Sequence, residues 1–316
     1  MSKDIPNLTA PISELPKKVE RISPAEEEVF SKLIPKFQEL RINVDEFVKV
    51  SESGGGYSRE EIERDKESVQ RKKKKIEDQD TAPTKRAQIL EALMAEQIEL
   101  SEWLGPDAMT IIPAEYDDLY NGVDLATEFQ GADSLQHLAM GVDVTSSPTP
   151  IEKKLTAIRD HLMDGSLTQM KYFTSEGLPD FHGRMSNIPQ IVIGTDARTI
   201  NELAQLWLTI EHSKKPEAGT SSIDRDALRE KAREAQQKLA HHRIQVLILK
   251  QMQAQLETFQ TYTKKNSQPN VSSKLASILK LIDDILKEKR ISKIDEQLNE
   301  QDDVFRSIKI NLEKLF

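Results

Sequence analysis

Two apolar segments, each interrupted by one aspartate, decide the fold of this chain. Residues 122–129 have the sequence GVDLATEF, and residues 138–145 have the sequence LAMGVDVT. Short runs of this kind, rich in Val and Leu and bounded by turn residues, are typical of buried β-strands. Each predicted strand therefore carries one aspartate, Asp124 in the first and Asp143 in the second, among apolar neighbours.

The segments around these strands predict an α/β domain over residues 84–212. Working outward, periodicity and turn residues predict helix 84–104, strand 109–112, the two strands already described, helix 150–163, strands 169–174 and 190–193, and helix 195–211. The order is α-β-β-β-α-β-β-α. Since a helix crosses between strands, we expect a mixed sheet covered by helices, in the α+β or α/β class.

Residues 1–83 are expected to form an N-terminal arm with a charged helical segment. Residues 1–22 are rich in proline and indicate a loose arm, whereas Ser23-Pro24-Ala25-Glu26 is a helix start, and Pro35 is expected to interrupt or kink that helix. Residues 58–80 are almost wholly charged and include the basic run 71–75. A solvated helix face is the favoured interpretation of that run. A nucleic-acid contact is the alternative, although no aromatic residue interleaves the lysines.

The C-terminal third is expected to be helical. Residues 213–222 have the composition of a linker, and residues 223–316 carry apolar positions at alternating spacings of four and three. That stripe predicts a helical hairpin or a coiled coil, with a turn near Pro269. The pairing partner is either the chain itself, a second copy in a homodimer, or a partner helix.

Composition limits the classes of function. The net charge of -9 gives no overall attraction to nucleic acid or to anionic membranes. The absence of cysteine excludes disulfides, thiolate nucleophiles and zinc–cysteine sites. No signal peptide is visible and no run approaches the roughly 18 apolar residues that a membrane span needs, so we expect a cytoplasmic protein with no membrane contact.

The two strand aspartates are the side chains that point to chemistry. A carboxylate in a buried strand is costly unless it is paired, hydrogen-bonded or bound to a metal. Two of them on adjacent strands repel each other and raise each other's pKa unless a cation lies between them. Mg²⁺ meets both requirements, since it binds a few carboxylates together with water and substrate phosphate. The alternative is that Asp124 and Asp143 are strand-end residues that cap neighbouring loops.

Other candidates have ordinary structural interpretations. Asp117 and Asp118 are expected in a solvent-facing turn, and Glu128 on the strand surface. The pair His241-His242 is expected to be part of the helical stripe. The remaining histidines lack metal-binding spacing, and the chain has neither a P-loop nor a GxGxxG motif.

The helix-strand-strand-strand-helix-strand order, with acids on the second and third strands, resembles the restriction-endonuclease-like superfamily of PD-(D/E)xK nucleases over residues 84–212. The resemblance implies Mg²⁺ bound by Asp124 and Asp143, with Asp143 in the place of the (D/E)xK acid. It also implies a glutamate from the first helix, for which Glu96 or Glu99 is available.

One residue departs from that family pattern. The family lysine stands two residues after the strand acid, where this chain has Thr145. Lys153, Lys154 and Lys171 are the available substitutes, with Lys154 or Lys171 expected to orient the water or steady the scissile phosphate. Without such a lysine the domain would be a catalytically inactive relative.

Two functions therefore remain open. The first is a metal-dependent nuclease-like protein that acts on or binds nucleic-acid phosphodiesters, with Asp124, Asp143, Lys154 and Lys171 at the catalytic site and Asp124, Asp143 and Glu96 as metal ligands. The second is a non-catalytic scaffold that assembles through its C-terminal helices.

Overall fold

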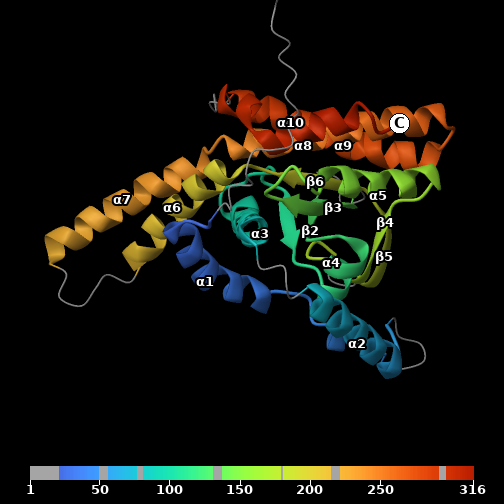
Figure 1. Cartoon of the computed structure of the whole chain (residues 1–316), viewed down its shortest axis with the longest axis horizontal. Coiled ribbons are helices and arrows are strands. Elements are labelled where there is room, and N and C mark those ends of the chain that lie inside the picture. The colour runs from blue at the N-terminus through green and yellow to red at the C-terminus, as the bar shows by residue number, and fades with distance from the viewer. Residues whose placement is uncertain are drawn as a thin grey trace, which may run out of the picture.

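The computed structural model describes residues 21–49, 56–76, 81–130, 137–178, 181–214, 221–291 and 297–316. A mixed four-stranded sheet lies at its centre, between a layer of C-terminal helices and the helices of the N-terminal half (Figure 1). Within this described part of the chain, no helix is both long enough and apolar enough to cross a membrane.

The central sheet has the strand order β1-β2-β3-β6. Its strands are β1 (Ala108–Ile111), β2 (Leu125–Gln130), β3 (His137–Thr145) and β6 (Gln190–Gly194). β2 is antiparallel to both β1 and β3, whereas β3 and β6 are parallel. Parallel neighbours need a crossover connection, and helix α5 (Ile151–Met163) begins that connection after β3. The mixed sheet predicted from the sequence is confirmed.

Two elements of the central region differ from the sequence-based expectation. Strand β4 (Thr168–Thr174) pairs with β5 (His182–Ile188) in a separate two-stranded sheet, and β5 has no counterpart in the prediction. Its sequence, HGRMSNI, is mostly polar and largely exposed, so it lacks an apolar strand signal. Helix α4 (Glu115–Asn121) occupies the segment expected to be a turn, and it ends at Gly122, whose φ of 67° suits glycine.

The first helix belongs to the core, whereas most of the loose arm predicted over residues 1–22 lies outside the described residues. Helix α1 (Pro24–Glu39) packs against α3 (Ala82–Leu100) and α6 (Ala197–Lys214). Ser23 and Glu26 form the capping box that starts α1, and the fully buried Glu26 also accepts a 2.7 Å bond from Arg86 Nε on α3. Pro35 lies inside α1, which continues past it.

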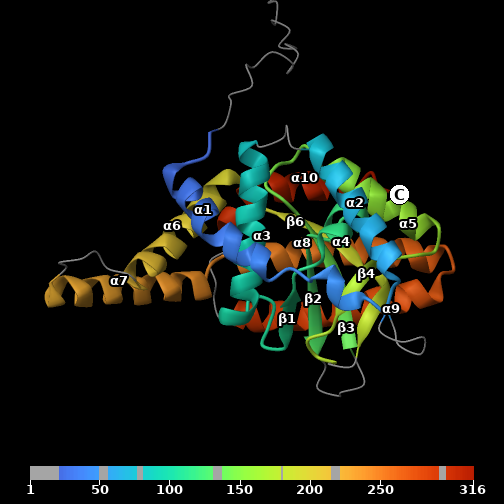
Figure 2. The same cartoon turned by 90° about the horizontal axis from the view of Figure 1, so that it is seen from below.

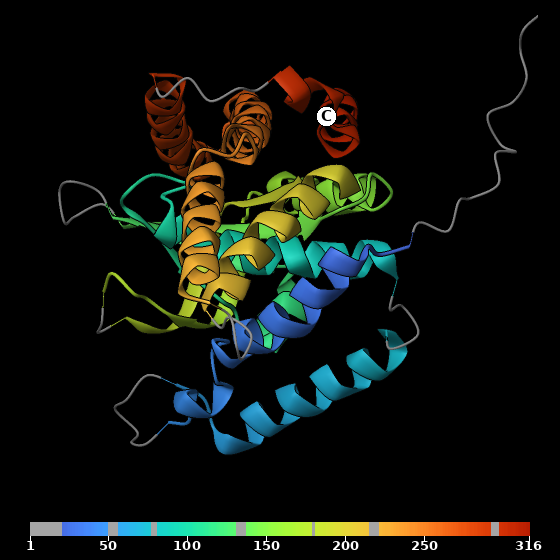
Figure 3. The same cartoon turned by 90° about the vertical axis from the view of Figure 1, so that its left-hand side faces the viewer.

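The charged segment forms helix α2 (Arg59–Ile76), which follows the short helix η2 (Val44–Phe47) and lies against α4 (Figures 2 and 3). Its contacts with the rest of the protein are both apolar and polar, since Ile62 is buried in a cluster with Phe47 and Tyr172. Lys72 donates to the carbonyl of Leu119, and Lys73 pairs with Glu115. Three other members of the basic run, Arg71, Lys74 and Lys75, are exposed, as expected for a solvated face.

The C-terminal helices cover the sheet. They comprise α7 (Ser222–Ala240), α8 (Ile244–Lys265), α9 (Pro269–Ile291), η4 (Gln297–Gln301) and α10 (Asp303–Leu312). Helices α8 and α9 form the predicted hairpin, whereas α7 packs beside α6 in an arm that projects from the body (Figure 1). One hydrophobic core includes residues from α1, the sheet, α8, α9 and α10. The proposed boundary at residue 223 therefore crosses a shared core.

Two glutamines of α8 cover the open edge of β6. Gln255 donates to the carbonyl of Val192 at 2.6 Å and accepts from its N–H at 2.8 Å. Gln251 makes the same pair of bonds with Gly194, at 2.7 and 2.9 Å. A sheet edge exposes unpaired backbone groups that invite another strand, so this i, i+4 pair both attaches α8 and blocks strand addition.

Replacing either Gln251 or Gln255 by leucine is expected to lower the free energy of unfolding by about 2–4 kcal/mol, because two buried backbone groups of β6 lose their partners. Urea denaturation followed by circular dichroism measures this change. Gln260→Leu on the same helix is the matched control, with an expected effect within about 0.5 kcal/mol. Equal stability of all three variants would show that the edge bonds contribute nothing.

Candidate functional site

Asp124 and Asp143 lie side by side on adjacent strands. Asp124 directly precedes β2, and its backbone N–H donates to the Val142 carbonyl at 2.9 Å, which places it beside β3. The Asp124 carboxylate accepts a 2.6 Å bond from the Val144 N–H, and the carboxyl groups of Asp124 and Asp143 share a hydrogen bond. Burial and the neighbouring Asp143 charge raise the pKa of Asp124 to about 7. Burial also raises the pKa of Asp143.

Lys154 brings its ammonium group to this pair from helix α5. It donates to the Asp143 carboxylate and, at 3.0 Å, to the Val144 carbonyl. Burial alone would lower the pKa of Lys154, but the charges of Asp143 and Asp124 raise it, so the side chain stays protonated. Of the lysines considered from the sequence, Lys154 meets the strand acids.

The helix glutamate that faces this site is Glu91, and not the predicted Glu96 or Glu99. Glu91 is buried on α3, and burial together with the charges of Asp124 and Asp118 raises its pKa well above the ordinary value. Glu96 instead accepts a 2.8 Å bond from the Trp207 indole N–H, and Glu99 accepts from the Thr110 N–H at 3.1 Å. Two positions five residues apart on an α-helix point about 140° away from each other around the helix axis, so Glu96 cannot lie on the same face as Glu91.

Asp118 and Arg41 complete the cluster. Asp118 lies on α4, where burial and the Asp124 charge raise its pKa to about 6. Arg41, just after α1, is 2.8 Å from the Asp118 carboxylate and 3.5 Å from that of Glu91. The expected solvent-facing turn was wrong for both aspartates of this segment, since Asp117 is fully buried and accepts bonds from the backbone of β4.

Lys171 lies in a different cluster. Its ammonium group pairs with Asp65 at 2.6 Å and Glu61 at 2.8 Å, both on α2. The rings of Tyr57 and Tyr116 lie within 4.7 and 5.4 Å of the same nitrogen. The structure therefore places Lys171 as a link between β4 and α2 and does not bring it to Asp124 or Asp143.

The charges of the cluster fit a divalent cation. Four carboxyl groups, the buried ones of Glu91 and Asp143 and the partly exposed ones of Asp118 and Asp124, face the two cations Arg41 and Lys154, which leaves an excess of negative charge when all are ionised.

Among the described residues, no group of three or more acidic or histidine side chains is arranged to hold a metal ion. Mg²⁺ does not need such a group, because it usually takes one or two carboxylates and completes its octahedron with water and substrate phosphate. The all-oxygen pair of Asp124 and Asp143 therefore fits Mg²⁺.

Two further residues differ from their expected roles. Glu128 is buried, not on the surface, and its carboxylate accepts bonds from the N–H groups of Glu176 and Gly177 at 2.7 and 3.3 Å. His241 and His242 lie in the turn that joins α7 to α8, and not within a continuous helix.

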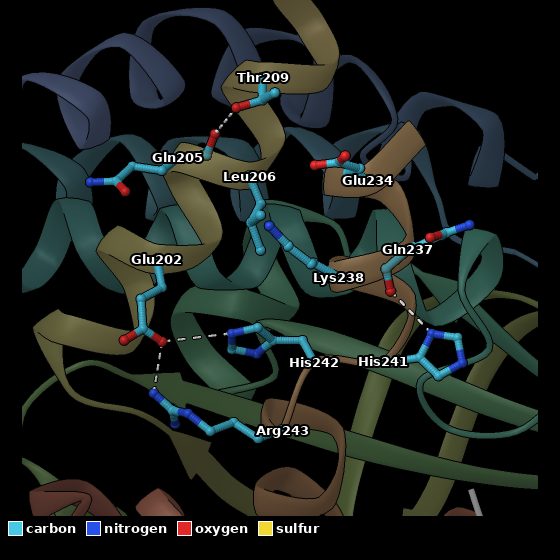
Figure 4. Close-up of a pocket in the computed structure, with 10 residues that line it drawn as sticks. All are labelled: Glu202, Gln205, Leu206, Thr209, Glu234, Gln237, Lys238, His241, His242 and Arg243. Atoms are coloured by element: carbon cyan, nitrogen blue, oxygen red, sulfur yellow. Dashed lines mark hydrogen bonds and ion pairs between the residues drawn. The ribbon is translucent and has the colours of Figure 1, made fainter. Parts of the chain in front are cut away.

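A larger cleft lies elsewhere, between α6 and α7 (Figure 4). It has a volume of about 780 Å³ and is open to solvent. Three of its polar groups already interact with one another, since Glu202 is 2.8 Å from Arg243 and 3.7 Å from His242. The carboxylate cluster contains strongly shifted acids of the kind found at reactive sites, so we take it as the candidate site.

Comparison of the chain with known protein families, curated proteins and solved structures finds no match. We therefore infer the function from the fold and from the geometry of the carboxylate cluster.

Proposed function

We propose that this protein is a Mg²⁺-dependent phosphodiesterase that cleaves nucleic acid. The observation that carries the proposal is the position of Lys154, which reaches Asp143 from α5 and so supplies the ammonium group that Thr145 cannot. The resemblance to PD-(D/E)xK nucleases implies the parts found here: an acid before β2, an acid in β3, a lysine beside them and a buried glutamate on the preceding helix.

Each residue has a definite task in this proposal. Asp124 and Asp143 would hold the metal, with Asp124 fixed by the Val144 N–H. When bound, Mg²⁺ polarises the phosphodiester and lowers the pKa of a water molecule. Lys154 keeps its bond to the Val144 carbonyl and turns its remaining N–H donors to the attacking water or the scissile phosphate. Arg41 pairs with Asp118 and Glu91 behind the metal ligands, and its charge opposes the rise in their pKa values.

Calorimetric titration of the full chain with Mg²⁺ and Mn²⁺ tests the metal site. We expect binding by the natural protein and its loss in Asp124→Ala, because one of two carboxylate ligands is removed. Asp160→Asn, at an exposed position on α5, is the matched control and should bind as the natural protein does. The full chain is needed, since Arg41 comes from outside residues 84–212.

Nuclease activity is then assayed on single- and double-stranded DNA and RNA, with Mg²⁺ or with EDTA. Cleavage that needs Mg²⁺ and disappears in Asp124→Ala supports the proposal. Metal binding that is unchanged in Asp124→Ala would contradict it, and so would the absence of hydrolysis on all four substrates.

The non-catalytic scaffold remains the second prediction, but the structure adds no observation that favours it. The part of the apolar stripe that lies on α8 is buried within the chain, where Val246, Leu249 and Leu256 belong to the core shared with the sheet.

A further inference from the structure

A second cavity opens beside the carboxylate cluster, between the end of α1, the turn that follows it, α2 and α4. Its volume is about 350 Å³, and its lining includes Gln38, Arg41, Val44, Val69, Gln70 and Tyr116. Arg41 belongs to both features, because the same guanidinium group pairs with Asp118. A ligand in this α1–α2 cavity would therefore lie against a side chain that borders the proposed metal site.

The walls of the α1–α2 cavity suit a planar ring with polar edges. Tyr116, Val44 and the buried Val69 supply apolar surface. Gln38 and Gln70 are exposed at the rim and present amide groups. Nucleobases combine an apolar face with donors and acceptors along the edge, and side-chain amides are suited to bonding that edge.

Two cationic and two acidic side chains line the cavity, and both acids are paired with lysines, Asp65 with Lys171 and Glu115 with Lys73. Arg41 forms one wall, and Lys66 of α2 lines another. Lys66 is paired with Asp45 at 2.6 Å and Glu63 at 3.1 Å, and all three side chains are substantially exposed. Exposed pairs of this kind contribute little stability, so Lys66 can exchange a carboxylate for a phosphate at small cost.

The volume of the cavity limits the size of the ligand that it can hold. Small-molecule sites usually measure about 300–1,000 Å³, which places this cavity at the lower end. It accommodates one nucleotide but not a base pair with its stacked neighbours.

We propose that the α1–α2 cavity binds one nucleotide of the substrate strand, with its base between Tyr116 and the glutamine amides and its phosphate toward Arg41. The inference rests on the proposed function and narrows its substrate class to nucleic acid with an unpaired or extruded nucleotide. Enzymes that act on an extruded nucleotide hold its base in such a pocket by stacking and edge hydrogen bonds.

The test measures binding separately from hydrolysis. A fluorescein-labelled single-stranded DNA of 12 nucleotides is titrated with the full chain in Ca²⁺, and its anisotropy gives Kd. Gln70→Ala, which removes one amide, should weaken binding about fivefold. Gln70→Glu has nearly the same shape and adds a negative charge near the phosphate, so it should weaken binding about tenfold or more. Gln236→Glu, on the exposed face of the projecting α7, should bind as the natural protein does.

Each outcome decides between the two proposals. Unchanged binding in both Gln70 variants would overturn the cavity assignment, while hydrolysis by the natural protein would leave the proposed function intact. Weaker binding in the variants without any hydrolysis by the natural protein would keep the nucleotide site and reject the nuclease. Equal affinity of the natural protein for a fully paired duplex would reject the preference for an unpaired nucleotide.

Discussion

Lys154→Met is expected to lower the rate of Mg²⁺-dependent hydrolysis by about 100- to 1,000-fold. Removing one charged donor at a developing transition-state charge typically has an effect of this size. Metal binding should survive, because Asp124 and Asp143 both remain and Asp143 loses its competing ammonium partner. Single-turnover cleavage measured beside calorimetry separates the two effects.

Lys153→Met is the matched control, since Lys153 is exposed on the same helix and should leave the rate unchanged. A second substitution sharpens the test. Thr145 lies two residues after Asp143 in β3 and therefore on the same face of the strand. Thr145→Lys in the Lys154→Met protein should restore part of the activity. If Lys154→Met cleaves as fast as Lys153→Met, Lys154 has no catalytic role.

The sequence predicted the elements with strong apolar signals and missed the polar ones. The segment 138–145 was recognised because its residues are buried on both faces, as β3 confirms. Strand β5 exposes most of its side chains, and α4 is only seven residues long, so neither has a periodic pattern to detect. The C-terminal stripe was recognised as helical, but a stripe of leucines looks the same whether it faces another helix or a sheet.

The candidate site was predicted only in part for a related reason. The two strand aspartates were found because each lies in an apolar run, and Glu91 carries the same signal within Ile89-Leu90-Glu91-Ala92-Leu93. A single acid inside an apolar helix face is costly unless it has a partner, so this criterion could have favoured Glu91 over Glu96. Arg41 could not be predicted, since only the packing of α1 on α3 brings it to Glu91.

The raised acid pKa values predict an unusual dependence of stability on pH. Asp124 has a pKa of about 7 in the folded chain, against 3.8 ordinarily. Between these values the folded state binds more protons than the unfolded state, so stability falls as pH rises. At about 1.4 kcal/mol per pKa unit, the loss attributable to Asp124 is on the order of 4 kcal/mol, and it is complete above the folded pKa. Asp118, with a pKa of about 6, adds to the fall in the same direction.

Asp124→Asn should therefore stabilise the metal-free protein most at pH 8 and much less at pH 5, where only about a third of the loss attributable to Asp124 has occurred. The amide removes the charge that repels Asp143 and still accepts the bond from the Val144 N–H. Urea denaturation in EDTA at pH 5, 6, 7 and 8 measures the difference in unfolding free energy between the variant and the natural protein. The contributions of the histidines cancel in this difference, because the same histidines titrate in both proteins. Asp160→Asn, at an exposed position, should follow the natural protein at every pH.

Adding Mg²⁺ completes this test. At pH 8 a metal concentration 100 times Kd should stabilise the natural protein by about 2.7 kcal/mol. Asp124→Asn should gain much less, because it has lost a charged ligand. A carboxylate that weakens the fold until a cation binds is placed there for function, since stability alone would favour the amide. If Asp124→Asn is instead less stable than the natural protein at every pH, Asp124 is a structural acid that caps β3. This outcome would contradict the proposed metal site.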